Sequence, residues 1–109
     1  MEVIITEKCK KHLHRLLKKY ISIEKDLLQL VNSLEQNPFQ GDALGKNCYK
    51  IRFPITSKGY GKSYGARAIT CVKITENNIF LLTIYDKSDK KDISDKELIS
   101  LLKEAGLKQ

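Results

Sequence analysis

The spacing of apolar residues changes along the chain, and this change restricts the fold more than any other feature of the sequence. Between residues 7 and 36 the apolar residues recur every three or four positions, which is the period of an amphipathic helix. From residue 49 to residue 86 they alternate with polar residues or form short runs rich in Ile, Val and Thr, which indicates strands. Helices followed by strands predict an α+β domain.

Two helices joined by a short turn are predicted in the first third of the chain. The first begins at Glu7, where Thr6 can cap it, and the second begins after Ser22. The second ends at Asn37, because the residue before Pro38 is disfavoured in the helical region. A connection of about two residues favours an antiparallel helical hairpin. The two apolar stripes are Cys9, Leu13, Leu16, Leu17 and Tyr20, then Ile23, Leu27, Leu30, Val31 and Leu34.

Four strands are predicted, at residues 2–5, 49–55, 66–75 and 79–86. In the second of these the odd positions from Tyr49 to Ile55 are apolar and face one side of the sheet. The intervening Lys50 and Arg52 face the other side, so we expect one apolar face and one cationic face.

The predicted connections and the last helix complete the order of elements. Phe39 to Asn47 are predicted as a loop, and Glu76 to Asn78 as a tight hairpin turn. Ser94 and Glu97 fit a capping box that opens a C-terminal helix, and Gly106 is suited to end it. The order β-α-α-β-β-β-α predicts one α+β domain over residues 1–109, with the helical hairpin packed on one side of a small antiparallel sheet.

Positive charge is concentrated in the middle of the chain. Seven of the twenty Lys and Arg residues lie between Ala43 and Thr75, and this span contains no Asp or Glu. The rest of the chain carries thirteen cations and thirteen acids, so the net charge of +7 comes entirely from this span. A focused positive field of this kind attracts phosphate groups or an acidic protein partner.

The segment SKGYGKSYGAR, Ser57 to Arg67, joins the second and third predicted strands and concentrates glycine and positive charge. It contains Gly-Lys-Ser, the end of a phosphate-binding P-loop. That fingerprint also requires a glycine where Thr56 stands, and a helix where this chain predicts a strand, so the P-loop is excluded. A simple hairpin connection would account for the glycines alone.

The residues around this segment favour nucleic-acid binding over a simple connection. Lysine and arginine suit phosphate contacts, and tyrosine rings can stack on bases. On an antiparallel sheet the outward side chains of neighbouring strands converge on one surface. We therefore predict a surface that binds nucleic acid or phosphate, formed by Lys50, Arg52, Lys58, Tyr60 and Tyr64.

Several motifs along nearly the whole chain point to one family. YKIRFPITSK is followed by GYGKSYGARAITCV and then by IFLLTIYDKSDKKDISDKELISLL. Together these motifs resemble the RelE/ParE superfamily of bacterial type II toxins, and within it the HigB-like branch. The chain departs from the branch at Tyr60, where a lysine is common, and at Tyr64, where a glycine is common.

The resemblance implies an activity and a set of partners. RelE-type members are ribosome-dependent endoribonucleases that cut mRNA in the ribosomal A site and need no cofactor. They are silenced by a co-encoded antitoxin, which for HigB-like toxins usually carries a helix-turn-helix domain. We therefore expect an antitoxin, mRNA and the ribosome as partners, and the cytoplasm as the location.

The resemblance also implies catalytic residues. Cleavage needs a base for the ribose 2'-hydroxyl, cations for the phosphate and an acid for the leaving oxygen. Arg67 matches the family's phosphate-stabilising arginine, and Lys62 is the first candidate for the base or a phosphate clamp. Lys87 matches a catalytic cation after the last strand, and Tyr85 can orient RNA or share in proton transfer. Which group is the general base stays open.

Two other functions fit the same sequence. The superfamily includes ParE-type toxins that inhibit gyrase, and one fold can host both activities. A non-catalytic RNA- or ribosome-binding module would also use a cationic sheet face. Codon-phased mRNA cleavage, DNA damage, and salt-sensitive binding without cleavage distinguish the three.

The remaining residues with reactive side chains predict no metal site. Cys9, Cys48 and Cys71 have no metal-ligand spacing and are expected to be small buried or half-buried residues. His12 and His14 are two positions apart, so they point in different directions and are expected to be exposed on the first helix. No apolar run approaches the ~20 residues that span a membrane.

Overall fold

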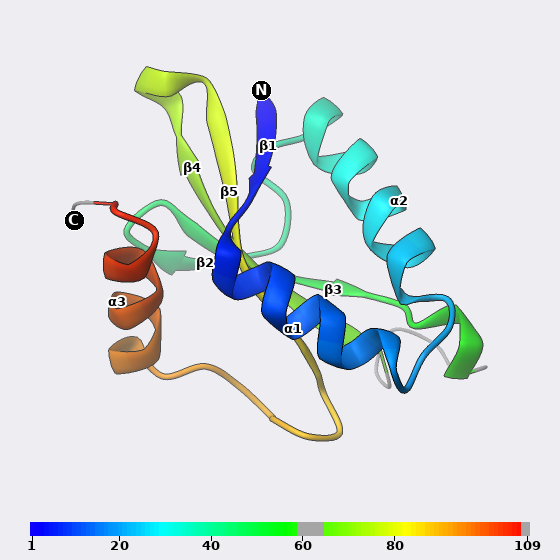
Figure 1. Cartoon of the computed structure of the whole chain (residues 1–109). Helices are drawn as coiled ribbons and strands as arrows, with labels where there is room; N and C mark the ends of the chain where they lie inside the picture. Colours follow the sequence, from blue (N-terminus) through cyan, green and yellow to red (C-terminus); the bar gives the residue numbers. More distant parts are fainter. Residues whose placement is uncertain (59–64, 108–109) are drawn as a thin grey trace.

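The structure is a computed structural model that describes residues 1–58 and 65–107, shown in Figure 1. Its helices are α1 (Glu7–Leu17), α2 (Ile23–Gln36) and α3 (Asp95–Glu104). Its strands are β1 (Glu2–Ile5), β2 (Asp42–Gly45), β3 (Cys48–Phe53), β4 (Ala66–Lys73) and β5 (Asn78–Asp86). Two short 3-10 turns, η1 (Thr56–Lys58) and η3 (Ile74–Glu76), follow β3 and β4. The predicted α+β class and the order of the helices are confirmed.

The strands form a five-stranded sheet in the order β1-β5-β4-β3-β2. All neighbouring pairs are antiparallel except β1 and β5, which are parallel, so the sheet is mixed rather than wholly antiparallel as predicted. The chain between β1 and β5 passes through α1, α2 and the other three strands, and parallel neighbours need such a long connection rather than a tight hairpin.

The prediction of a loop from Phe39 to Asn47 was wrong for residues 42–45, which form β2 at the edge of the sheet. Left-handed backbone at Gly45, Lys46 and Asn47 turns the chain sharply from β2 into β3. The sequence Asp-Ala-Leu-Gly of β2 contains an acid and a glycine, which are rare in strands, and its pairing depends on the neighbouring strand.

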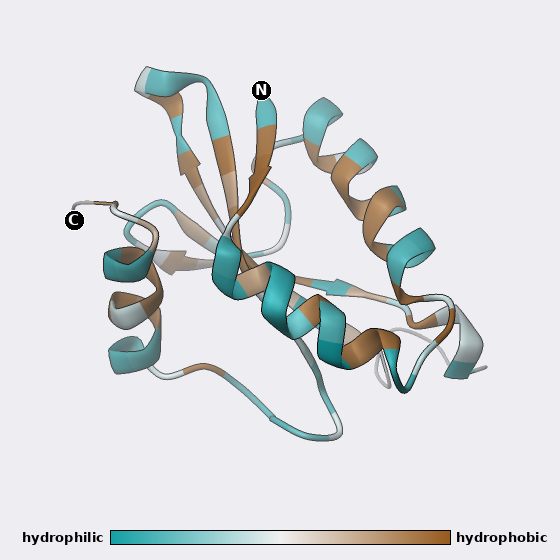
Figure 2. Cartoon of the chain, viewed as in Figure 1, coloured by the Kyte–Doolittle hydropathy of each residue, from teal (hydrophilic) through white to brown (hydrophobic). Residues whose placement is uncertain are grey.

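Side chains pack on both faces of the sheet. On one face, α1 and α2 cover Ile51, Phe53, Ala68 and Leu81, as the alternation in β3 predicted. On the opposite face, α3 covers residues of β3, β4 and β5; this second cluster contains Cys48, Ile69, Cys71, Leu82, Tyr85, Leu98, Leu101, Leu102 and Leu107. Figure 2 shows that β4 and β5 are hydrophobic along their middle and hydrophilic at the hairpin tip.

The ends of the helices follow the capping predictions with one exception. The Thr6 side chain accepts a hydrogen bond from Cys9 N, and Ser94 and Glu97 form the predicted capping box. Ser22 is the N-cap residue of α2 but its side chain caps no helical N–H. Its hydroxyl contacts Asp26 and Ser57 instead, because η1 lies against the start of α2.

Cysteines and helix lengths complete the description. Cys9, Cys48 and Cys71 are buried free thiols, as expected. Burial raises the pKa of Cys9 to about 12, which keeps its sulfur protonated and unreactive. Within the described ranges, none of the helices is long and apolar enough to cross a membrane.

Candidate active site

The strand register aligns three of the predicted site residues across the sheet. Arg52 of β3 lies opposite Arg67 of β4, and Arg67 lies opposite Tyr85 of β5. Directly opposed residues have Cα atoms about 4.5–5.5 Å apart, so their side chains are neighbours. Because Ile51 and Phe53 face α1 and α2, this arginine row (Arg52, Arg67 and Tyr85) faces the α3 side.

Arg67, the central residue of the arginine row, is only 2% exposed although it carries a charge. Its Nη1 donates to the carbonyl oxygen of Ala66 at 3.1 Å. Burial, and next the neighbouring charge of Arg52, lower its pKa from the usual value for arginine. Arginine still remains protonated, so the sheet holds a desolvated cation beside an exposed one.

Tyr85 ends the arginine row with an unsatisfied hydroxyl. The residue is 9% exposed, and its Oη has no hydrogen-bond partner among the residues that the structure describes. Burial raises its pKa, so the hydroxyl keeps its proton at neutral pH. A buried hydroxyl without a partner costs roughly 1–3 kcal/mol, which an incoming acceptor such as a phosphate oxygen would recover.

Lys50 lies two residues before Arg52 in β3, so it is on the same face of the sheet. Its Nζ is 3.1 Å from Oδ1 of Asp92, in the segment between β5 and α3. The Ile93 N–H and then Lys50 lower the pKa of Asp92, so this carboxylate is charged at neutral pH. Asp92 therefore holds the cation of Lys50 on the α3 side of the sheet.

Lys87 follows β5 immediately and lies beside the arginine row. Its backbone N–H donates to the carbonyl oxygen of Gly65 at 3.1 Å, and its side chain is half-buried. Its positive charge also contributes to the lowered pKa of Asp92. The structure thus brings Lys50, Arg52, Arg67, Tyr85 and Lys87 to one region of the sheet.

Lys58 lies in a different environment from the other described site residues. Its Nζ is 3.1 Å from Oδ1 of Asp86 and lies over the Tyr20 ring, near the end of α1. The predicted role of Lys58 in RNA binding stays a prediction, and its contacts here are with protein groups. Tyr60, Lys62 and Tyr64 lie outside the described residues, so their predicted roles are also untested.

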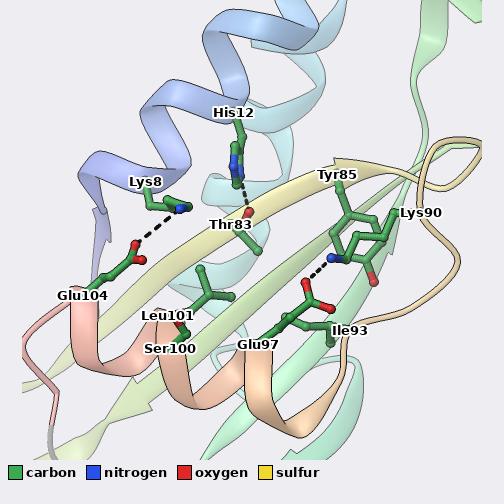
Figure 3. A pocket seen from close by; sticks show the side chains of 10 residues that line it. All are labelled: Lys8, His12, Thr83, Tyr85, Lys90, Ile93, Glu97, Ser100, Leu101 and Glu104. Carbon is green, nitrogen blue, oxygen red and sulfur yellow. Dashed lines mark hydrogen bonds and ion pairs between the residues drawn. The ribbon is translucent and has the colours of Figure 1, made fainter.

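His12 was predicted to be exposed on α1, but the structure buries half of it. Its Nδ1 is hydrogen-bonded to Oγ1 of Thr83 on β5, as Figure 3 shows. Burial lowers its pKa, and the charges of Arg15, Lys8 and Lys90 lower it further, so the imidazole is neutral at neutral pH. A signal was present in the sequence, since His12 lies three residues after Cys9 and four before Leu16, next to the apolar stripe.

A cavity of about 280 Å³ lies between α1, α3 and β5, beside the arginine row. It is lined by Tyr85 and His12 together with two ion pairs, Lys8–Glu104 and Lys90–Glu97, which Figure 3 shows. Within residues 1–58 and 65–107, no three His, Cys, Asp or Glu side chains come close enough together to hold a metal ion.

Comparisons with known proteins agree with the fold described above. Residues 8–108 match the family model described as the RelE toxin of the RelE / RelB toxin-antitoxin system. A free-state structure of a double arginine-to-alanine mutant of the E. coli toxin RelE is similar over 96% of this chain and 93% of that chain, with a TM-score of 0.61 and 17% identity. A crystal structure of the isolated E. coli RelE toxin in its P21 form is similar over 94% of this chain and 96% of that one, with a TM-score of 0.61 and 15% identity.

The two kinds of comparison carry different weight. No curated protein sequence matches the chain. At such low identity the structural likeness shows the fold alone, whereas the family model matches almost the whole length of the chain. The chain therefore belongs to the RelE family of toxins of toxin-antitoxin systems.

Proposed function

We propose that this toxin is a ribosome-dependent endoribonuclease that cleaves mRNA during translation. The observation that carries the proposal is the arginine row. In it a buried cation lies between an exposed cation and a tyrosine hydroxyl that has no hydrogen-bond partner among the described residues. This arrangement suits a group that carries several anionic oxygens, and the scissile phosphate of RNA is such a group.

In the proposed reaction the ribose 2'-hydroxyl loses its proton and attacks the neighbouring phosphorus. The bond to the 5'-oxygen breaks, that oxygen takes up a proton, and the products are a 2',3'-cyclic phosphate and a 5'-hydroxyl. Negative charge builds on the phosphate oxygens during the attack. Arg67 stabilises that charge from within the sheet, and Arg52 binds the phosphate from the exposed side.

Tyr85 and the lysines take the remaining roles. The Tyr85 hydroxyl keeps its proton and donates a hydrogen bond to a phosphate oxygen. Lys87 supplies the cation next to the leaving oxygen, and Lys50 binds the neighbouring phosphate after exchanging Asp92 for it. Lys62 is the first candidate for the general base, on the resemblance of its sequence motif alone.

The partner of this toxin is proposed to be an antitoxin with a helix-turn-helix domain, as in the HigB-like branch. Family membership implies a cognate antitoxin, and the branch suggests its type. Purification of the toxin with the product of the adjacent gene, followed by binding of the pair to DNA from the shared promoter, tests this. A partner without DNA-binding activity would contradict the helix-turn-helix assignment.

The nuclease proposal is tested in a translating bacterial extract that contains a reporter mRNA. Wild type, Arg67→Ala and Arg15→Ala are added at equal concentrations, and the 5' ends of the mRNA are mapped by primer extension. Arg15 is a matched control, because it is an exposed arginine on α1 outside the arginine row. We expect codon-phased cuts with wild type and Arg15→Ala, and none with Arg67→Ala.

Each other result identifies another function. Absence of cuts together with inhibition of gyrase in a supercoiling assay would make the protein a ParE-type toxin. Binding to ribosomes that weakens steeply with salt, without any cuts, would make it a non-catalytic module. Cuts that persist in Arg67→Ala would remove the arginine row from the mechanism.

A further inference from the structure

Asp86 follows Tyr85 in β5 but lies on the opposite face of the sheet, toward α1. It is 2% exposed, and a buried carboxylate is rare unless several donors satisfy it. The catalytic roles proposed above use Tyr85 and Lys87 on either side of it and leave Asp86 without a function.

Four hydrogen bonds converge on this carboxylate. Oδ2 accepts from Oη of Tyr20 at 2.5 Å. Oδ1 accepts from Nζ of Lys58 at 3.1 Å, and from the backbone N–H and hydroxyl of Ser88 at 3.0 and 2.8 Å. The Asp86 cluster (Tyr20, Lys58, Asp86 and Ser88) therefore joins the end of α1, the turn η1 and the segment after β5 at one point.

The backbone at this point is fixed as well. Asp86 pairs with Ala66 at the start of β4, and the N–H of Lys87 donates to the carbonyl oxygen of Gly65. Gly65 lies so close to β3 that an added Cβ would be 2.4 Å from the carbonyl oxygen of Phe53. Asp86 thus binds Lys58 through its carboxylate and lies opposite Ala66 in the sheet, while the next residue, Lys87, donates its backbone N–H to Gly65. These contacts lie at the two described ends of the glycine-rich segment.

This convergence has a consequence for the arginine row. Arg67 follows Ala66 directly, and Tyr85 precedes Asp86 directly, so the position of the row depends on the pairing that Asp86 holds. Loss of the carboxylate would leave Tyr20 and Lys58 without their buried acceptor. The corner formed by the ends of β4 and β5 would then separate, and the row would lose its alignment.

We propose that Asp86 is a positioning residue, which aligns Arg67, Tyr85 and Lys87 from the opposite face of the sheet without touching RNA. The inference rests on the proposed nuclease function for its kinetic consequence. Its structural consequence, a more open corner at Lys87, can be measured whether or not the protein cleaves RNA.

A second buried carboxylate on the same face provides a matched control. Asp26 is 4% exposed and accepts hydrogen bonds from Ser22 Oγ at 2.7 Å, from Thr56 N at 2.9 Å and from Thr56 Oγ1. These partners tie η1 to α2 and lie outside β4 and β5. Asp26→Asn therefore removes a comparable buried charge next to η1 while keeping all four hydrogen-bond donors of the Asp86 carboxylate.

The experiment compares wild type, Asp86→Asn, Asp26→Asn and Tyr20→Phe. Single-turnover cleavage of mRNA on programmed ribosomes gives the maximal rate and the half-saturating toxin concentration for each, corrected for the folded fraction from urea unfolding. Amide hydrogen exchange of Lys87 is measured in parallel, with Val72 in the distant half of β4 as the internal reference. Tyr20→Phe keeps the Asp86 carboxylate and removes one of its hydrogen-bond donors, so it tests the same cluster if Asp86→Asn fails to fold.

For Asp86→Asn we expect the maximal rate to fall about 10- to 100-fold, because a small misplacement of catalytic groups is costly, with the half-saturating concentration unchanged. Lys87 exchange should accelerate relative to Val72. Tyr20→Phe should show the same pattern to a smaller extent. Asp26→Asn should change neither the maximal rate nor the exchange of Lys87. An unchanged corrected rate in Asp86→Asn, or equal changes in Asp26→Asn, would overturn the inference. If wild type does not cleave, the nuclease proposal fails, and unchanged Lys87 exchange would additionally refute the role of Asp86 in holding the corner.

Discussion

Tyr85 and Asp86 are consecutive residues in one strand, yet their surroundings are opposite in kind. The Asp86 carboxylate receives four hydrogen bonds, so its surroundings are complete within the protein. The Tyr85 hydroxyl is buried with no partner among the described residues, beside a desolvated arginine. Most buried polar groups in folded proteins have a hydrogen-bond partner. The difference shows that the Asp86 carboxylate is satisfied by the protein itself, and it is consistent with our proposal that the arginine row binds a phosphate.

Among the substitutions that test this difference, replacement of Arg67, the central residue of the arginine row, has the largest expected effect. In Arg67→Met the side chain keeps a similar volume and loses its charge. Cleavage should fall about 100- to 1,000-fold, which is the usual loss when one stabilising donor is removed from an active site. The free energy of unfolding should stay the same or rise, because the charge is held in a desolvated position beside Arg52. Urea unfolding and primer extension measure the two quantities. A strong loss of stability would place Arg67 among the structural residues instead.

The second effect concerns the Asp86 carboxylate, and it is measured as the dependence of the free energy of unfolding on pH. Burial alone would raise the pKa of Asp86, but hydrogen bonds from Tyr20, Ser88 and Lys58 outweigh it and lower the pKa to about 2. A lowered carboxyl pKa stabilises the fold above the unfolded pKa of 3.8, and this stabilisation is lost as pH falls toward 2. Wild type should therefore lose roughly 2 kcal/mol more stability than Asp86→Asn between pH 5 and pH 2. Parallel acid-dependent slopes for the two proteins would show that the carboxylate is not held in its charged form.

These two residues also show what the sequence could and could not predict. Alternation in β3 placed Lys50 and Arg52 on the face opposite Ile51 and Phe53, because the strand period needs only local information. The alignment of Arg52, Arg67 and Tyr85 depends on the register of three strands, which no single segment specifies. The same is true of Lys58 and Asp86, which are 28 residues apart and were not predicted to meet.

Two other differences between the predicted and the observed structure, at β2 and at His12, have separate physical reasons. The edge strand β2 has the sequence Asp-Ala-Leu-Gly, whose acid and glycine disfavour a strand, and its pairing comes from β3. His12 adjoins the apolar stripe of α1, but its burial depends on a partner, Thr83, that arrives from the far end of the chain. Polar residues at the border of a stripe can be exposed or buried, and the partner strand decides which.

A third and smaller effect is expected when the hydroxyl of Tyr85 is removed. Tyr85→Phe removes only Oη, so it should raise the free energy of unfolding by about 1 kcal/mol, because an unpaired buried hydroxyl disappears. Cleavage should fall about tenfold if the hydroxyl donates to the phosphate in the transition state. Tyr20→Phe is the opposite case, since it removes a satisfied hydroxyl and should lower stability. Equal stability changes in the two variants would remove the distinction between the two sides of the strand.

The smallest effect concerns the ion pair at the edge of the cationic face. Asp92 is 63% exposed at its side chain, so its contact with Lys50 is worth at most about 1 kcal/mol and is screened by salt. Asp92→Asn should therefore leave stability nearly unchanged and free Lys50 for a phosphate. Binding of a short single-stranded RNA to the cleavage-deficient Arg67→Met protein should tighten about twofold at low salt, and the gain should vanish near 1 M salt, where the Debye length is about 3 Å. Asp95→Asn is the control, since Asp95 is an exposed acid in the first turn of α3 with no ion pair to Lys50. Equal tightening in both variants would mean that overall charge, and not release of Lys50, governs RNA binding at this face.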